Sequence, residues 1–413
     1  MKSENVDVVV IGAGPAGSVA ASHLANNGFK IKVIEKQVFP RFVIGESLLP
    51  HCMDQLKETG LLDAVKEIGF QKKTGASFYR EDASCEFSFE EQFTSGWSWT
   101  WQVQRATFDQ TLAEATAAKG VDVNFGCSVT DVNCDNEIKT VTYETPDGEK
   151  HLVKCRFVID ASGYGRVLPR LFDLDKPPTS EPRGAVFCHL NDANRTVHAG
   201  ENIFVHAFED NKAWLWAIPF SDKTTSVGVV GEDTLIKDLA DNDGEKFIEL
   251  YQNFAGLKGR FAGIDPNFTP KNIMGYSVGV KKMYGNGYVL CGNSTEFLDP
   301  VFSSGVTLAT SSGFKAATLA IQELNGVTVD WENDYEKWMQ YGINVFRSYV
   351  KAWYTGELQT IFFAKNIDPS FKKQICSVLA GYVWDKSNPF VKKHTKLLTT
   401  LAKVIKLNEA ANV

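Results

Sequence analysis

A glycine-rich segment near the N-terminus has the residue types and spacing that can hold a pyrophosphate. Gly12, Gly14 and Gly17 form a G-x-G-x-x-G pattern, and Glu35 follows it in the chain. In such a pattern the first glycine permits a tight turn, the second lets the backbone approach the phosphates, and the third lets a helix pack closely against a strand. The carboxylate of Glu35 would accept hydrogen bonds from ribose hydroxyls. These residues predict a dinucleotide-binding site.

The elements that must position these residues can be predicted from the flanking sequence. Residues 7–11 form an apolar run that predicts a buried strand, residues 16–27 have the pattern of a helix ended by Gly28, and residues 30–35 predict a second strand. The free N–H groups at the start of this helix would face the phosphates. The strand, helix and strand around the glycines support the prediction more than the glycines do.

Two later segments also combine a strand with a loop of small residues. Residues 157–163 predict a buried strand that runs into Ser162 and Gly163. Residues 287–294 predict another strand and loop, followed by Asp299 and Pro300 and by a helix that starts near Gly305.

Together the three segments resemble the FAD monooxygenases that have the aromatic-hydroxylase fold. Within that group the chain resembles the flavin-dependent halogenases, because the sequence WLWAIP at 214–219 matches their W-x-W-x-I-P motif. The sequence GES at 45–47 and a lysine just ahead of GASF at 75–78 agree with the same family. The resemblance covers most of the chain, including its aromatic helical tail.

The resemblance implies FAD as the cofactor, bound by residues that are widely separated in the sequence. The predicted cofactor-binding residues are Gly12, Gly14, Ala16, Gly17, Glu35, Lys36, Arg41, Gly45, Glu46, Ser47, Arg105, Val129, Asp160, Gly163, Gly292, Asn293, Pro300, Gly305 and Val306. Asn293 stands where the family pattern has an aspartate, so one charge-assisted hydrogen bond would become an ordinary one.

The resemblance also implies which residues carry the halogen. Lys73 would deliver it to the substrate, whereas the neighbouring Lys72 would point the other way, since alternate residues of a strand face opposite sides. A solvated surface charge is the alternative interpretation of Lys73. The backbone amides of Ser304 and Gly305 would hold chloride or bromide beside the flavin, although the same amides could serve the flavin alone.

Trp214 and Trp216 would form a wall between flavin and substrate. Such a wall would block direct oxygen transfer and let hypohalous acid pass, which distinguishes a halogenase from a hydroxylase. Core packing is the alternative role for these two aromatic side chains.

One departure from the family bears on the substrate. The tryptophan-type halogenases carry the sequence ESTG where this chain has FSSG at 302–305. The missing glutamate would stabilise positive charge that develops on an indole ring. With Phe302 in its place, we expect a substrate that supplies its own activation, such as a phenol or a pyrrole, and not free tryptophan.

Composition excludes several classes of protein. The 413 residues carry 43 Lys and Arg against 50 Asp and Glu, a net charge of −7, which disfavours nucleic acid and anionic membranes as partners. The eight cysteines and seven histidines show neither metal-ligand nor nucleophile spacing, so no metal is expected and a hydrolase is excluded. No segment is long and apolar enough for a stable membrane anchor or a secretory signal, and we expect a cytoplasmic protein with reduced cysteines.

The predicted fold is α/β. Residues 1–75, 103–182 and 272–325 would form a discontinuous, Rossmann-like FAD-binding domain, residues 76–102 and 183–271 an inserted, mostly antiparallel β-sheet substrate domain, and residues 326–413 a helical C-terminal region.

The predicted function is that of an FAD-dependent oxidoreductase. It would use FADH2 to halogenate an electron-rich aromatic, either a small molecule or one tethered to a carrier protein, with a separate reductase supplying the reduced flavin. The alternatives are a non-halogenating flavin monooxygenase or a dehydrogenase resembling geranylgeranyl reductase, and a flavin-binding protein without turnover is a third.

Overall fold

The computed structural model describes residues 2–177, 182–192, 195, 201–276 and 278–411. One layer of the molecule is a six-stranded sheet, parallel except for its edge strand β20. Its strands lie in the order β20 (Tyr284–Gly285), β21 (Tyr288–Leu290), β12 (Phe157–Asp160), β2 (Val8–Ile11), β3 (Ile31–Ile34) and β8 (Asp122–Asn124). Strands that are far apart in the sequence therefore end side by side.

Helices built from small residues pack next to this sheet. α1 (Pro15–Asn26) follows β2, and it packs against α8 (Ser304–Leu324) and α4 (Arg105–Ala117). A Cβ on Gly313 of α8 would lie 2.3 Å from the carbonyl oxygen of Ala16, so α8 can approach α1 only because this position is a glycine. The short helices α2 (Cys52–Glu58) and α3 (Leu62–Glu67) pack on the same group. This packing places the middle of α8 against the start of α1.

A second, four-stranded sheet flanks the first. Its order is β1 (Lys2–Asn5), β11 (Lys150–Cys155), β10 (Lys139–Glu144) and β9 (Ser128–Asn133). A turn at residues 146–148 connects β10 to β11.

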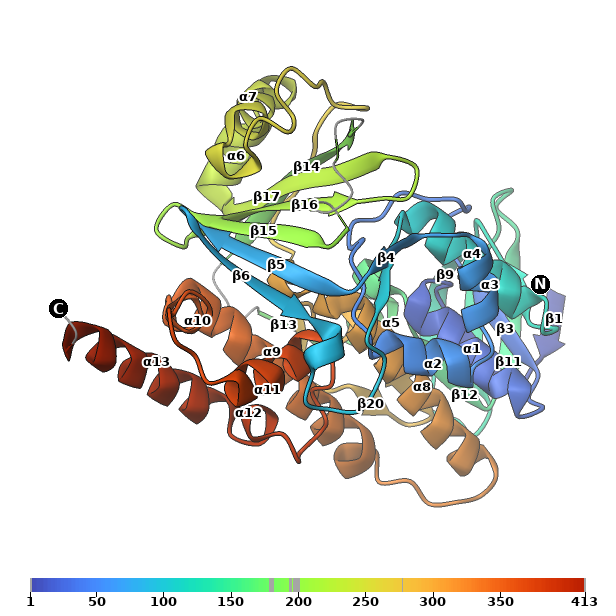
Figure 1. Ribbon diagram of the computed structural model, residues 1–413. Helices are drawn as coiled ribbons and strands as arrows, with labels where there is room; N and C mark the ends of the chain where they lie inside the picture. The colour runs from blue at the N-terminus through green and yellow to red at the C-terminus, as the bar shows by residue number, and fades with distance from the viewer. Residues whose placement is uncertain (1, 178–181, 193–194, 196–200, 277, 412–413) are drawn as a thin grey trace.

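A seven-stranded sheet forms a separate layer (Figure 1). Its order is β18 (Lys271–Ile273), β14 (Arg183–Asn191), β17 (Thr224–Glu232), β16 (Ala213–Pro219), β15 (Ile203–Phe208), β5 (Gly75–Arg80) and β6 (Ala83–Ser88). All neighbours are antiparallel except β15 and β5. β5 and β6, which precede residues 103–182 in the chain, thus lie in one sheet with five strands that follow them.

Both faces of this sheet are covered, which explains the uninterrupted apolar sequence of β16. Leu215 and Ala217 pack on one side against α6 (Asp233–Ala240) and α7 (Glu245–Asn253), whereas Trp214 and Trp216 point to the other side. The sequence predicts a mostly antiparallel β-sheet over residues 183–271, and α6 and α7 are helices that this prediction missed. Their apolar residues recur at helical spacing, as Ile236 and Leu239 and as Phe247 and Tyr251 do.

The C-terminal region is helical, as predicted. α9 (Lys337–Tyr354), α10 (Glu357–Phe362), α11 (Pro369–Leu379), α12 (Pro389–Lys392) and α13 (His394–Ala411) lie below the seven-stranded sheet in Figure 1, and α13 extends away from the body. The remaining elements are α5 (Val167–Leu171) and two small sheets, β13 (Asp175–Lys176) with β19 (Gly279–Val280) and β4 (Gln71–Lys73) with β7 (Thr100–Gln102).

The predicted α/β class, with an antiparallel second sheet and helical C-terminal region, is confirmed, while the residue boundaries of the domains stay a prediction. Within the described ranges, no helix is long and apolar enough to span a membrane.

Candidate functional site

The glycine-rich segment turns between β2 and α1, and its glycines serve different purposes. Gly12 has a φ of +100°, and a Cβ there would lie 2.5 Å from the carbonyl oxygen of Ala161. A Cβ on Gly17 would lie 1.9 Å from the carbonyl oxygen of Gly12. A Cβ on Gly14 would meet only the Arg41 guanidinium, at 3.4 Å. Gly12 and Gly17 therefore permit backbone packing, whereas Gly14 keeps space free for a ligand.

Glu35 lies beside this turn and is held by backbone groups. Its Oε2 accepts a hydrogen bond of 2.8 Å from the N–H of Ala13, and its Oε1 accepts one of 2.8 Å from the N–H of Gln37. Each carboxylate oxygen can accept a second bond. Glu35 can therefore still bind a ribose hydroxyl, as the sequence predicts.

Two arginines give this region positive charge. Arg105 donates to both carboxylate oxygens of Asp109, at 2.8 and 2.9 Å, and Arg41 lies 3.2 Å from the same carboxylate. Asp109 is fully buried and supplies one negative charge to two guanidiniums. The surplus positive charge suits an anion such as a pyrophosphate.

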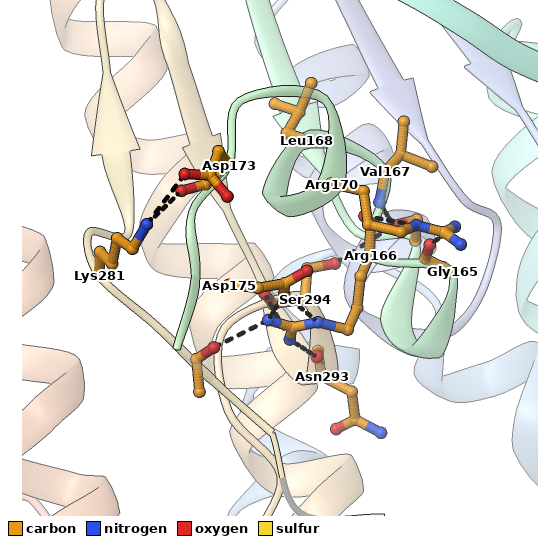
Figure 2. Close-up of polar contacts among 12 residues, drawn as sticks. Gly165, Arg166, Val167, Leu168, Arg170, Asp173, Asp175, Lys281, Asn293 and Ser294 are labelled. Carbon is orange, nitrogen blue, oxygen red and sulfur yellow. Dashed lines mark hydrogen bonds and ion pairs between the residues drawn. The ribbon is translucent and has the colours of Figure 1, made fainter. Parts of the chain in front are cut away.

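Arg166 joins the two later loops of the site, as Figure 2 shows. Its Nε donates to Asp175 at 2.9 Å, and its Nη1 donates to the carbonyl oxygens of Asn293 and Ser294, at 3.3 Å each. Its Nη2 donates to the carbonyl oxygen of Gly279 at 2.8 Å. The loop after β12 is thus fastened to the loop after β21.

Asp160 also holds these two loops in place through hydrogen bonds. Its carboxylate accepts hydrogen bonds from the N–H groups of Ser162 and Leu168, at 2.8 and 2.7 Å, and from the hydroxyl of Ser294 at 3.1 Å. Burial raises the pKa of this carboxyl, although the hydrogen bonds act in the opposite direction. Its lone pairs are used within the protein, so Asp160 orders the loop.

These segments enclose a cavity of about 480 Å³. It extends over residues of the glycine loop, the two later loops and the inner face of the seven-stranded sheet. The predicted cofactor residues that line it are Gly14, Ala16, Glu35, Lys36, Arg41, Gly45, Glu46, Ser47, Arg105, Gly163, Gly292, Asn293, Pro300, Gly305 and Val306. Four predicted cofactor residues do not line the cavity. Gly12 and Gly17 lie in close contact with backbone atoms, Asp160 faces the loops that it orders, and Val129 lies on β9.

Trp214 and Trp216 line the apolar part of this cavity. Their ring centroids are 5.7 Å apart, and their indole N–H groups donate to Tyr354 and Ser226, at 3.0 and 3.1 Å. A Cβ on Gly228 would lie 2.2 Å from the Trp216 ring, so this glycine makes room for the indole. Both tryptophans are fixed in place, which a wall beside the cavity requires.

Lys73 is buried, with 1% of its surface exposed, whereas Lys72 is exposed, as strand alternation predicts. The Lys73 amine donates to the Ser47 hydroxyl at 2.9 Å and to the Leu48 carbonyl oxygen at 2.8 Å, and it lies 5.5 Å from the Phe89 ring centroid. Lys73 does not line the cavity, because Ser47 stands between them. Burial lowers the pKa of this amine to about 7. A neutral amine can make both hydrogen bonds and still keep a lone pair.

The pKa of Lys73 predicts a pH-dependent stability. Between about pH 7 and its ordinary value of 10.5, the unfolded chain binds more protons at this residue than the folded chain does, so folding gains stability as pH rises through this window. From pH 7 to pH 9, we expect the free energy of unfolding of the parent to rise by about 2 kcal/mol relative to that of Lys73→Met. Urea denaturation at both pH values measures this difference. Lys72→Met should follow the parent, and equal slopes for the parent and Lys73→Met would contradict the burial argument.

The start of α8 also reaches the cavity. Ser303 has the left-handed φ of +57° and, like Gly305, lines the cavity, whereas Ser304 is buried beside it. The first N–H groups of a helix have no partner within the helix. This end of α8 therefore favours a small anion.

Glu46 and His189 connect the two layers at the cavity. The Nε2 atom of His189 lies 2.7 Å from Oε1 of Glu46, while Oε2 of Glu46 is buried and has no hydrogen-bond partner among the described residues. The Nε atom of Arg41 is likewise buried without a partner there. Unpaired polar atoms in a cavity wall are costly unless a ligand satisfies them. An unpaired acceptor on Glu46 and an unpaired donor on Arg41 thus fit a large polar ligand such as FAD.

Several lining residues carried no sequence signal. Tyr164, Tyr276 and Phe297 line the cavity, and Asp109 and His189 support it. Aromatic residues in loops have no periodicity that would single them out. Asp109 lies four positions after Arg105 in a helix, a spacing that could have indicated the pair. No cluster of metal-ligating side chains occurs in the part of the chain that the structure describes.

Comparisons with known proteins agree with this geometry. A family model described as FAD binding domain matches residues 5–327. The flavin-dependent halogenase armH3 of Armillaria mellea is 30% identical over 345 residues, which cover 78% of this chain and 68% of that protein. The 1H-pyrrole-2-carbonyl-[peptidyl-carrier protein] chlorinase of Pseudomonas fluorescens is 29% identical over 416 residues, covering 93% of this chain and 91% of that protein.

A solved structure, that of a flavoprotein/dehydrogenase from Cytophaga hutchinsonii, is similar over its whole length. Its TM-score is 0.96 at 52% sequence identity, with 98% of this chain and 100% of that chain covered.

Proposed function

Because this chain belongs to the flavin-dependent halogenases, enzymes with an FAD binding domain, we propose that it uses FADH2 and chloride or bromide to halogenate an electron-rich aromatic ring. It is an FAD-dependent oxidoreductase. The observation that carries the proposal is the tryptophan pair, which lines the apolar part of a cavity whose other part is formed by the glycine loop.

The residues of the cavity provide a place for each part of FAD. Gly14 and the start of α1 would hold the pyrophosphate, Glu35 the adenosine ribose, and the loop at Gly292 and Asn293 the flavin end. The charges of Arg41 and Arg105 would neutralise the phosphates. When bound in its reduced form, the flavin supplies, with dioxygen, the oxidising power that converts a halide into an electrophilic halogen.

The halide would bind at the start of α8. The N–H groups of Ser304 and Gly305 lie in the first turn of α8, where they have no partner within the helix, and their positive end would face the halide. The N–H of Ser303 is used by the carbonyl oxygen of Pro300, at 2.8 Å.

Lys73 would receive the electrophilic halogen and present it to the ring once the Ser47 side chain, which separates its amine from the cavity, turns aside. Its amine is neutral for part of the time at pH 7, since burial lowers its pKa to about 7, and its lone pair is then free to react. Trp214 and Trp216 would keep the substrate ring away from the flavin, so that the halogen and not an oxygen atom is transferred.

We infer that the substrate is a pyrrole tethered to a carrier protein, or a phenol. The Pseudomonas fluorescens relative is named for a carrier-bound pyrrole and covers almost the whole chain. Phe302 packs among Phe78, Tyr349 and Trp353, so no carboxylate stands there to activate an indole ring. A separate flavin reductase would supply FADH2. The eight free cysteines suit the reducing conditions of the cytoplasm.

The substrate class can be tested by product masses. We expect the enzyme, given a flavin reductase, chloride and a panel of aromatics, to chlorinate carrier-bound pyrrole-2-carboxylate or a phenol at least about tenfold faster than free tryptophan, because the ring must activate itself. Bromide in place of chloride shifts the product mass accordingly, and a reaction without halide is the control.

Three outcomes would contradict the proposal. Chlorotryptophan as the main product would refute the substrate class. A hydroxylated product would indicate a monooxygenase, and a hydrogenated product formed without halide would indicate the dehydrogenase activity for which the Cytophaga hutchinsonii relative is named.

A further inference from the structure

Tyr354, the last residue of α9, lies outside the predicted site but touches two of its parts. Its hydroxyl accepts a hydrogen bond of 3.0 Å from the indole N–H of Trp214 and donates one of 2.7 Å to Asp299. The Arg183 guanidinium lies over the Tyr354 ring, 3.6 Å from its centroid. One phenol thus links the C-terminal helices to β16 and to the loop before α8.

The direction of these hydrogen bonds is fixed by the indole N–H of Trp214, which can only donate. The Tyr354 oxygen therefore accepts from Trp214, and its proton points to Oδ2 of Asp299. This Oδ2 also accepts a bond of 3.1 Å from Tyr276, and Oδ1 accepts one of 3.1 Å from the N–H of Val301, while burial raises the pKa of Asp299. Burial and the adjacent Asp299 raise the pKa of Tyr354 well above its ordinary value, so the phenol stays neutral.

We propose that Tyr354 is a positioning residue that holds the Trp214 indole in the orientation needed for the wall. This inference rests on the proposed function. The indole N–H is a donor only, and Tyr354 is the partner that the structure gives it. Without that partner the N–H would be left unsatisfied in a buried site, which favours another orientation of the ring. Trp214 would then no longer separate substrate from flavin reliably.

The test compares two phenylalanine substitutions in the same helix. Tyr354→Phe removes the hydroxyl that binds Trp214. Tyr349→Phe removes a hydroxyl that is buried in α9 and has no hydrogen-bond partner among the described residues. Both variants lose only a phenol hydroxyl. The Tyr349 ring is fully buried and the Tyr354 ring is partly buried, and of the two hydroxyls only that of Tyr354 contacts Trp214 and Asp299.

The readout is the coupling ratio, that is, halogenated product formed per FADH2 oxidised. We expect Tyr354→Phe to lower this ratio about fivefold, with the difference released as hydrogen peroxide or free hypohalous acid, because one buried hydrogen bond is lost. FAD affinity should stay within about twofold of the parent, since Tyr354 does not line the cavity. Tyr349→Phe should couple like the parent.

A double-mutant cycle shows whether Tyr354 acts through Trp214. Trp214→Phe should lower the coupling ratio by itself, and adding Tyr354→Phe to it should cause no further loss. Independent, additive losses would overturn the inference, as would equal coupling in the Tyr354→Phe and Tyr349→Phe variants. If the parent forms no halogenated product under any condition, the proposed function fails and this inference fails with it.

Discussion

Lys73→Met should form roughly a hundredfold less halogenated product than the parent while oxidising FADH2 at a nearly parental rate. The oxidation belongs to the cofactor, whereas transfer of the halogen needs a nucleophilic nitrogen at this position. Met keeps the unbranched stem that packs near Phe89 but has no amine for Ser47 and Leu48. The measurement pairs product masses with peroxide and flavin-oxidation assays.

Lys72→Met is the matched control for this prediction. Lys72 lies in the same strand but is exposed, with its amine 5.2 Å from the Trp99 ring centroid. It should behave like the parent. Full halogenation by Lys73→Met would remove Lys73 from the mechanism, and a loss that includes FADH2 oxidation would indicate damage to the cofactor site instead.

Gly14→Val should weaken FAD binding by roughly a hundredfold or more, the second large effect that we expect. Gly14 lines the cavity at the start of α1, and a Cβ there would meet no protein atom closer than the Arg41 guanidinium at 3.4 Å. The fold should therefore tolerate the side chain, while a pyrophosphate would have to give up its approach to the backbone. Titration of FAD by fluorescence quenching measures the affinity.

Gly279→Val is a suitable control for the bulk of the added side chain. Gly279 lies in the short strand β19, and a Cβ there would come no closer than 4.0 Å to the Lys176 carbonyl oxygen. FAD affinity should be unchanged. If Gly14→Val binds FAD as tightly as the parent, the pyrophosphate must bind elsewhere. If the melting temperature falls in that variant alone, the weaker binding reflects a folding defect.

The glycine loop could be predicted because its function and its local structure use the same residues. Gly12 and Gly17 are needed for close backbone contacts, and those contacts lie within one strand–helix–strand unit or beside it. For Lys72 and Lys73, strand alternation predicts only that one of the two is buried. The place of Lys73 ahead of GASF at 75–78 favoured it, and Lys73 is the buried one.

The rest depends on contacts between distant parts of the chain. Trp214 and Tyr354 are 140 positions apart, and nothing in either neighbourhood indicates that their side chains meet. The family resemblance predicts that Asp160 binds the cofactor, whereas its oxygens accept hydrogen bonds from Ser162, Leu168 and Ser294. The sequence can identify a carboxylate near a site, whereas only the folded structure shows which donors form hydrogen bonds with it.

The strand order of the six-stranded sheet has a consequence for biosynthesis. β2 is made first, yet it pairs with β12, and β12 pairs with β21, which ends at Leu290. At roughly 5–20 residues per second, the ribosome makes β21 about 15–60 s after β2. During that time one edge of the growing sheet, first that of β2 and then that of β12, stays unpaired in the nascent chain. Aggregation competes with folding in this interval, so the yield of native enzyme in a heterologous host should depend on chaperones and on the speed of translation.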